Sequence, residues 1–312
     1  MAVRHMINTG FAKAKAYCSS ANLGAGFDVV GVALDAFFDE VEIEVREGNS
    51  VKLELAGMDV SAPNTASAAV KFFLQRIGRK ASVVIRLKKG VPTGLGLGSS
   101  GASAAAASYA INEVFGRPLS PVELVDIAAK SEGAAAAGTA HADNVAASLL
   151  GGFAFITSTD PFKAFSLKPR GFPGFYIAIP PKGPMDKKTK AARQVLPNEV
   201  SLRQSIVEKA ALLSMINAIL TEDYISLAKA LSLETPVELA RYQAGLIPCY
   251  SEIKAGLLKG GALGVCISGA GPSVLAYGIS PDFKRAIEEV YDGLGIKVDV
   301  RRTGIAPPTS SL

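Results

Sequence analysis

The stretch Val91-Pro-Thr-Gly-Leu-Gly-Leu-Gly-Ser-Ser-Gly-Ala-Ser103 decides how this chain folds. Glycines alternate at positions 94, 96 and 98, and two serines and a run of small residues follow them. Glycine adopts positive φ and lets the backbone approach a ligand closely. Where such a loop runs into a helix, free N–H groups and the positive end of the helix dipole point to one place. The pattern predicts a phosphate-binding loop; the alternative is a tight strand-to-helix turn in a crowded core.

Two common phosphate loops do not match this stretch. A Walker loop has a lysine after its last glycine, whereas Ser99 follows Gly98 here. The loop satisfies G-x-G-x-x-G, but the dinucleotide fingerprint also needs an acidic residue at the end of a second strand. Glu123 has that spacing, yet it belongs to Ser120-Pro-Val-Glu, which has the pattern of a helix capping box.

Three segments, in order along the chain, resemble the motifs of the GHMP kinases, which include galactokinase, homoserine kinase, mevalonate kinase and phosphomevalonate kinase. Residues 92–102 resemble the central motif P-x-x-x-G-L-G-S-S-A-A, with Gly101 in place of the first alanine. Ala16-Tyr-Cys-Ser-Ser-Ala-Asn-Leu-Gly-Ala-Gly-Phe-Asp28 resembles the N-terminal motif A-P-A-T-S-A-N-L-G-P-G-F-D. Gly264-Val-Cys-Ile-Ser-Gly-Ala-Gly-Pro-Ser273 resembles the third, glycine-rich motif.

Further segments are similar to one member family, homoserine kinase. They are Ser20-Ala-Asn-Leu-Gly with Gly26-Phe-Asp, His141-Ala-Asp-Asn, Leu149-Leu-Gly-Gly, and residues 189–197 and 241–248. Two positions depart from the family pattern. His-Ala stands for the usual His-Pro, and Leu239-Ala stands for the Glu-Pro that usually precedes the arginine at 241.

The resemblance implies both the activity and the fold. The implied activity is ATP-dependent phosphorylation of the side-chain hydroxyl of L-homoserine to O-phospho-L-homoserine, in threonine biosynthesis. The implied fold is α+β: residues 1–158 like domain 2 of ribosomal protein S5, residues 159–312 ferredoxin-like, and the active site between them. Two alternatives stay open, another small-molecule GHMP kinase such as a mevalonate-type kinase, and a non-catalytic relative that binds a metabolite.

The resemblance also implies sites for ATP and Mg²⁺. The ATP-binding residues would be Asn64, Pro92, Gly94, Leu95, Gly96, Leu97, Gly98, Ser99, Ser100, Gly101 and Ala102. Mg²⁺ would be bound by Ser100 and by Glu132, because one carboxylate, a hydroxyl and phosphate oxygens form a normal Mg²⁺ site. Alternatively, Glu132 is a solvated helix residue, although its small apolar neighbours argue against this.

Each polar group of homoserine needs a partner. Arginine matches a carboxylate with two parallel hydrogen bonds, and the resemblance places Arg193 and Arg241 there. It places Asp28 at the ammonium group. Asn22 and Asn144 would orient the hydroxyl, since an amide both donates and accepts. His141 either lines this pocket or makes a structural hydrogen bond.

The catalytic base is an open question between two neighbouring residues. Mevalonate-type members use an aspartate followed by Asn, a fixed distance before Gly-Gly. Counted back from Gly151-Gly152, Asn144 and not Asp143 takes the aspartate's place. In that register the proton would pass to the γ-phosphate or to water, and catalysis would rest on proximity and Mg²⁺. The alternative keeps Asp143 as the base.

Composition restricts the remaining classes of protein. The 312 residues are 49% hydrophobic and 20% charged with a net charge of +5, which indicates a globular chain. We expect no membrane span, no secretory signal and no nucleic-acid partner, since the basic clusters lack neighbouring aromatics. Three scattered cysteines argue against a disulfide framework or a zinc site. Such cysteines fit a reducing compartment, and we therefore expect a cytoplasmic protein. We also expect a homodimer.

Hydrophobic periodicity predicts the order of the elements. Strands are expected at 11–19, 41–45, 82–87, 175–179, 265–268, 273–277 and 297–302. Helices are expected at 64–77, 99–115, 121–136, 142–150, through about 200–258, and at 281–293. The rise in Pro, Lys and Phe across residues 157–174 predicts a hinge or linker.

Overall fold

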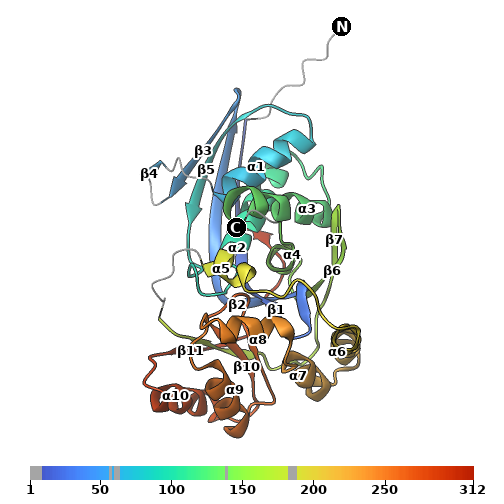
Figure 1. The fold of residues 1–312 in the computed structure, drawn as a ribbon. Coiled ribbons are helices and arrows are strands. Elements are labelled where there is room, and N and C mark those ends of the chain that lie inside the picture. Colours follow the sequence, from blue (N-terminus) through green and yellow to red (C-terminus); the bar gives the residue numbers. More distant parts are fainter. Residues whose placement is uncertain (1–8, 56–57, 60–63, 138–139, 182–187) are drawn as a thin grey trace.

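The computed structural model describes residues 9–55, 58–59, 64–137, 140–181 and 188–312, and these form two sheets with helices packed against both (Figure 1). Among the described residues, the first sheet has eight strands in the order β12-β1-β2-β5-β3-β4, with β6 paired to β2 and β7 paired to β6. The second has four, in the order β11-β8-β10-β9. This is the predicted α+β class.

The first sheet is built around two long strands. Its members are β1 (Gly10–Asn22), β2 (Gly26–Arg46), β3 (Ser50–Leu55), β4 (Met58–Asp59), β5 (Ser82–Lys88), β6 (Phe153–Thr159), β7 (Phe162–Leu167) and β12 (Ser310–Ser311). In β2, Val41, Ile43 and Val45 are buried and alternate with glutamates. Two of these glutamates pair with Arg86 and Lys88 of β5 on the outer face. The period of two gives the sheet one apolar and one charged face.

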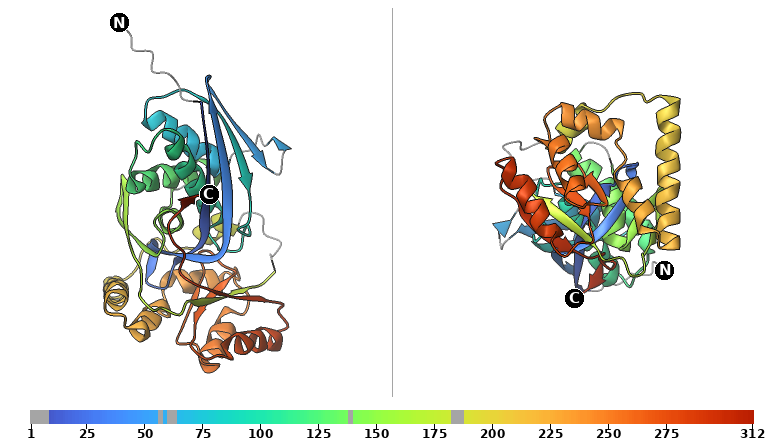
Figure 2. Two further views of the ribbon diagram at one scale, coloured as in Figure 1. Left: turned by 180° about the vertical axis from the view of Figure 1, so that it is seen from behind. Right: turned by 90° about the horizontal axis from the view of Figure 1, so that it is seen from below.

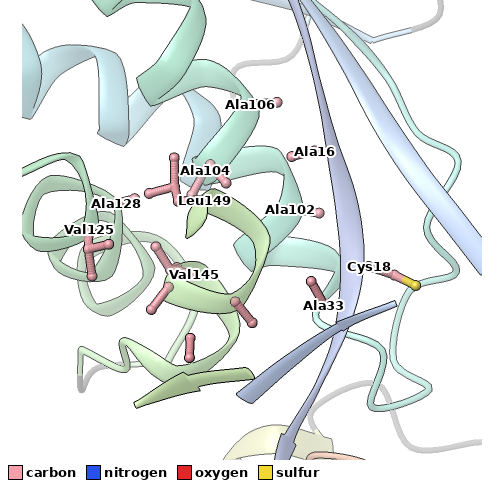
Figure 3. Packing of buried hydrophobic residues seen from close by; sticks show 14 of the residues in the cluster. Ala16, Cys18, Ala33, Ala102, Ala104, Ala106, Val125, Ala128, Val145 and Leu149 are labelled. Atoms are coloured by element: carbon pink, nitrogen blue, oxygen red, sulfur yellow. The ribbon is translucent and has the colours of Figure 1, made fainter. Parts of the chain in front are cut away.

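In the part of the chain that the structure describes, four α-helices cover the apolar face of this sheet. They are α1 (Thr65–Arg76), α2 (Ser99–Val114), α3 (Pro121–Glu132) and α4 (Asp143–Leu150). Helix α2 lies between β1 and the other helices, and Ala102, Ala104 and Ala106 are fully buried along it (Figure 3). Small side chains let a helix approach its neighbours closely on all sides. The alanine run therefore places α2 in the centre of the core.

Two predicted helix starts are confirmed in detail. Asn64 caps α1, because its side chain accepts a hydrogen bond from the Ala66 backbone N–H at 2.8 Å. Ser120 and Glu123 form the predicted capping box at the start of α3. The helix predicted to continue to residue 136 ends as an α-helix at Glu132 and continues as a π-helical turn, Gly133–Ala137.

The remaining described helices follow or lie between the strands of the second sheet along the chain. Its strands are β8 (Phe175–Ile179), β9 (Gly264–Ile267), β10 (Val274–Tyr277) and β11 (Asp299–Thr303), and the helices are α5 (Lys188–Gln194), α6 (Leu202–Thr221), α7 (Tyr224–Leu231), α8 (Pro236–Gln243), α9 (Tyr250–Lys259) and α10 (Phe283–Gly293). Phe175 and Ile177 of β8 pack into the core of the first sheet, whereas Tyr176 and Ala178 pack with α9 and α10. Figure 2 shows α6 at the edge of the molecule.

The prediction of a hinge over 157–174 is wrong for the first part of that segment. Strands β6 and β7 form a hairpin there, with Phe155 paired to Phe165, and β6 also pairs with β2. Phe162, Lys163 and Phe165 belong to β7, and Pro161 lies in the turn before it, so part of the composition that suggested a linker belongs to the hairpin. The division at residue 158 stays a prediction, and the sheets change only between β7 and β8. None of the described helices is long and apolar enough to cross a bilayer.

Candidate active site

The predicted phosphate loop connects β5 to α2, and its glycines have the expected backbone. Gly94, Gly96 and Gly98 have φ values of 75°, 77° and 65°, in the region that favours glycine. A Cβ on Gly96 would lie 2.1 Å from the Ser268 carbonyl oxygen, and one on Gly98 would lie 2.1 Å from Ser19 Oγ. Both conformation and close approach therefore require glycine at these two positions.

The loop is held by the third glycine-rich motif. Ser268 Oγ donates a hydrogen bond to the Gly96 carbonyl at 2.8 Å. The Ser19 N–H donates to the Leu97 carbonyl at 3.1 Å. Leu95 and Leu97 are buried, so they anchor the loop with their side chains. The loop can therefore present backbone groups and side-chain hydroxyls to a phosphate.

The N-terminal motif forms a tight turn between β1 and β2, opposite the phosphate loop. Asn22 and Asp28 both have positive φ, at 75° and 61°. Asn22 Oδ1 accepts the Asp28 N–H at 3.2 Å, and its Nδ2 donates to the Gly269 carbonyl at 2.9 Å. The N-terminal motif thus contacts both glycine-rich motifs, through Ser19 and Asn22, and its non-glycine residues with positive φ are of the kind found at binding sites.

Ser100 and Glu132 meet as the metal prediction requires. Ser100, in the first turn of α2, donates its hydroxyl to Glu132 Oε1 at 2.5 Å. Glu132 ends α3 and is only 6% exposed, and burial raises the pKa of its carboxyl to about 7. Two oxygen donors converge where a cation would relieve a poorly solvated carboxylate. The donor set fits Mg²⁺, which needs few protein ligands when phosphate oxygens supply the others.

The predicted substrate residues Asp28, Arg193 and His141 form one cluster. Arg193 Nη2 lies 2.6 and 2.8 Å from the two carboxylate oxygens of Asp28 and 2.6 Å from His141 Nδ1. Burial lowers the pKa of His141, so the neutral imidazole, with Nδ1 as acceptor, is the form at neutral pH. His141 Nε2 is buried and lacks a partner among the described residues.

Arg241 also lies close to Phe27. Both guanidinium groups are close to this ring, with Arg193 Cζ at 5.3 Å and Arg241 Cζ at 5.5 Å from its centre. Arg241 is 5% exposed and donates to the Gly269 carbonyl at 2.7 Å, and its buried Nε lacks a partner within the described chain. Burial, helped by the charge of Arg193, lowers the Arg241 pKa to about 10.

Asp143 and Asn144 are the first two residues of α4. Asn144 Oδ1 accepts the Ser19 hydroxyl at 2.9 Å, and a Cβ on Gly98 would lie 2.7 Å from it. Asp143 is 3% exposed, and burial, together with the negative charge of Asp28, raises its pKa to about 7. Asp143 also raises the pKa of Glu132, so the structure couples these carboxylates electrostatically.

The structure therefore brings the predicted residues together around one centre, with one qualification. Asn64 is beside the loop, since the next residue, Thr65, donates its hydroxyl to the Ser100 carbonyl at 3.0 Å. The Asn64 side-chain oxygen, however, caps α1. Sequence reasoning missed Ser19, Phe27 and Ser268. All three lie inside the quoted motifs, so their positions could have marked them as candidate site residues. Their contacts, however, depend on the fold.

Comparisons with known proteins agree with this arrangement. The family description GHMP kinases N terminal domain matches residues 64–152. The homoserine kinase of Pyrobaculum islandicum is 38% identical over 294 residues, which are 93% of this chain and 97% of that one. The homoserine kinase of Aeropyrum pernix is 40% identical over 306 residues, 95% of this chain and 96% of that one.

Solved structures agree as well. The crystal structure of homoserine kinase from Cytophaga hutchinsonii has a TM-score of 0.85 and 30% identity, and the match covers 99% of this chain and 100% of that one. Mevalonate diphosphate decarboxylase from Staphylococcus aureus has a TM-score of 0.73 at 17% identity, over 98% of both chains, and so shares the fold. With relatives of this identity over nearly its whole length, the chain belongs to the homoserine kinase family of the GHMP kinases.

Proposed function

We propose that this protein transfers the γ-phosphoryl group of ATP to the side-chain hydroxyl of L-homoserine, giving O-phospho-L-homoserine and ADP, a step of threonine biosynthesis. One observation supports an amino acid as the substrate. A carboxylate, Asp28, and two guanidinium groups, Arg193 and Arg241, surround Phe27 beside the phosphate loop. This charge pattern matches an amino acid, which has one ammonium and one carboxylate group. A coupled assay with ATP and homoserine, mevalonate, galactose and shikimate tests the proposal.

We further propose that residues 94–102 bind the ATP phosphates through backbone N–H groups at the start of α2. Phosphoryl transfer depends mainly on positioning and charge neutralisation, and the helix dipole adds positive potential at this point. Ser100 and Glu132 would hold Mg²⁺, which when bound supplies charge neutralisation at the phosphates. Asn64 would contribute at the edge of this site.

Substrate binding would exchange one set of ion pairs for another. Arg193 is hydrogen-bonded to Asp28 in this structure, so a zwitterionic substrate must separate them. The ammonium group of the substrate would pair with Asp28, and its carboxylate would pair with Arg193 and Arg241. The exchange conserves charge pairing, so little desolvation cost is left uncompensated. Asn22, Asn144 and His141 would line the rest of the pocket, with the amide of Asn144 orienting the hydroxyl.

For proton transfer we propose the arrangement in which Asn144, and not a carboxylate, lies at the base position. The contact of Asn144 with Ser19 beside Gly98 supports this, since it places the amide against the phosphate loop. The competing role of Asp143 as base is favoured by its raised pKa. Asp143→Asn decides between them: turnover within about tenfold of wild type supports Asn144, and a loss of about 10³-fold supports Asp143.

We propose a homodimer and a cytoplasmic location as the setting of this activity. Leu202, Ile206, Leu213 and Leu220 of α6 are all more than half exposed, which supports association through that helix. Analytical ultracentrifugation of the wild type and of Leu213→Asp tests the dimer.

A further inference from the structure

A buried polar cluster lies beneath the phosphate loop and takes no part in the proposed chemistry. It consists of Asp39 on β2, Lys89 just after β5, and Ser103 in α2, and we refer to these three residues as the loop anchor. Asp39 is 0% exposed. A fully buried carboxylate on a strand is unusual and is costly unless every oxygen is satisfied.

Asp39 holds the beginning of the loop. Its Oδ1 accepts the backbone N–H groups of Gly90 and Val91 at 2.9 and 3.0 Å. Its Oδ2 accepts the Ser103 hydroxyl at 2.7 Å and the Lys89 ammonium at 2.5 Å. Gly90 also lies directly on β2, since a Cβ there would be 2.1 Å from the Phe38 carbonyl oxygen.

Lys89 connects the same carboxylate to the end of the loop. Besides Asp39, its ammonium lies 2.8 Å from the Ser99 carbonyl and 2.9 Å from Ser103 Oγ. These three acceptors use all three of its hydrogens. The lysine therefore has no hydrogen left for a phosphate oxygen and differs in role from the lysine of a Walker loop, which binds the phosphates directly.

Together these contacts tie the two ends of the loop to one carboxylate. Gly90 and Val91 lie at the start of the loop, and Ser99 and Ser103 lie after its end. The Ser99 hydroxyl also links the two ends directly, because it donates a hydrogen bond to the Val91 carbonyl at 2.9 Å. The separation of the ends fixes where the first N–H groups of α2 and the Ser100 hydroxyl point.

We propose that Asp39 and Lys89 are positioning residues for phosphoryl transfer, which hold the loop of residues 91–98 in the geometry that binds the ATP phosphates. The inference rests on the proposed role of that loop. Replacing both partners of a largely buried ion pair by uncharged side chains removes two poorly solvated charges together, whereas removing one partner leaves the other charge uncompensated and is strongly destabilising. Stability and positioning can therefore be separated by comparing single and double variants.

The experiment uses Lys89→Met, Asp39→Asn and the double variant, with Lys130→Met as the matched control. Lys130 pairs with Asp126, a carboxylate that also accepts a backbone N–H, from Phe162, but lies away from the loop. In each protein, thermal unfolding is recorded, ATP binding is measured by calorimetry without acceptor, and KM for homoserine is measured at saturating ATP.

We expect both single variants to lose thermal stability and to bind ATP at least about tenfold more weakly, because a displaced loop loses aligned donors. In the double variant the melting temperature should return close to that of wild type while ATP binding stays at least about tenfold weaker. KM for homoserine should change less than about threefold throughout, and Lys130→Met should leave ATP binding unchanged.

Wild-type ATP affinity in the double variant would overturn the proposal, since the pair would then serve stability alone. Equal losses for ATP and homoserine would also overturn it, because they indicate general damage to the fold. ATP binding is measured without acceptor, so failure of the wild type to phosphorylate homoserine would count against the proposed function and not against the anchor.

Discussion

Arg193 contacts both carboxylate oxygens of Asp28, at 2.6 and 2.8 Å, although Arg193 lies in α5 and Asp28 in β2, 165 positions apart. The contact pairs the two opposite charges that an amino-acid substrate would need. Because each charge is paired with the other, neither of these partly buried side chains is costly to keep in the fold. The substrate, we propose, replaces each residue's partner with one of its own charged groups.

The first prediction concerns Asp28→Asn. The variant keeps size and hydrogen bonding but removes the charge, so kcat/KM for homoserine should fall by about 10²-fold or more. A homoserine analogue without the amino group should react poorly with wild type and lose little further in the variant. Steady-state kinetics on both substrates measures the difference. Equal losses would mean that Asp28 serves only to hold the turn between β1 and β2.

The second prediction separates the two arginines. Arg193→Leu should raise KM for homoserine by roughly 30- to 800-fold, the equivalent of about 2–4 kcal/mol for a charge-assisted contact, with little effect on KM for ATP. Arg241→Leu should raise it too. Because Arg241 also donates to the Gly269 carbonyl, which Asn22 shares, this second variant should lower thermal stability as well. A uniform effect of Arg193→Leu on both substrates would contradict a carboxylate-binding role.

The third prediction concerns Glu132→Gln. The glutamine can still accept from Ser100 but cannot balance the charge of Mg²⁺. Turnover should fall by at least about 10²-fold, while ATP affinity changes little, because charge neutralisation matters most in the transition state. Titration calorimetry and initial rates over a range of Mg²⁺ concentrations check both parts. Turnover close to wild type would remove Glu132 from the metal site.

The fourth prediction is a pH dependence of stability in the absence of nucleotide and metal. The pKa values of Glu132 and Asp143 are raised to about 7, above those of an unfolded chain. Their contribution to the free energy of unfolding is thus complete below the ordinary pKa values, 3.8 for Asp143 and 4.5 for Glu132, and is lost as pH rises through about 7. In that window stability should fall by about 1.4 kcal/mol per pH unit for each carboxyl still protonated. Urea unfolding at several pH values should show a shallower slope in Glu132→Gln, and an unchanged slope would contradict the burial argument.

Local sequence patterns predicted the elements around the site well. The glycine loop, the capping box at Ser120 and the two central strands of the second sheet, β8 and β10, follow from rules that act within a few residues. The hairpin of β6 and β7 was missed because its stability comes from pairing with β2, a strand more than a hundred positions earlier. Composition alone could not distinguish the Pro, Lys and Phe residues of this hairpin from those of a linker.

The site shows the same limit. The resemblance to the GHMP kinases indicated Ser100, Glu132 and Asp28, and two of them, Ser100 and Asp28, lie within the quoted motifs. The loop anchor could not be predicted, since Asp39 and Lys89 are 50 positions apart and no motif joins them. Nor could the contact of Phe27 with both arginines be predicted, because it requires α5 and α8 to approach the same turn in the fold.

The most direct test of the proposed activity is the assay of the purified wild-type protein with Mg·ATP and four acceptors: homoserine, mevalonate, galactose and shikimate. ADP release is coupled to NADH oxidation, and the phosphorylated product is identified by ³¹P NMR. We predict turnover with L-homoserine and a phosphate ester on its side-chain hydroxyl, with kcat/KM for mevalonate lower by at least about 10²-fold, because mevalonate has no ammonium group for Asp28. Comparable or higher efficiency with mevalonate, or ATP binding without turnover of any acceptor, would contradict the proposed function.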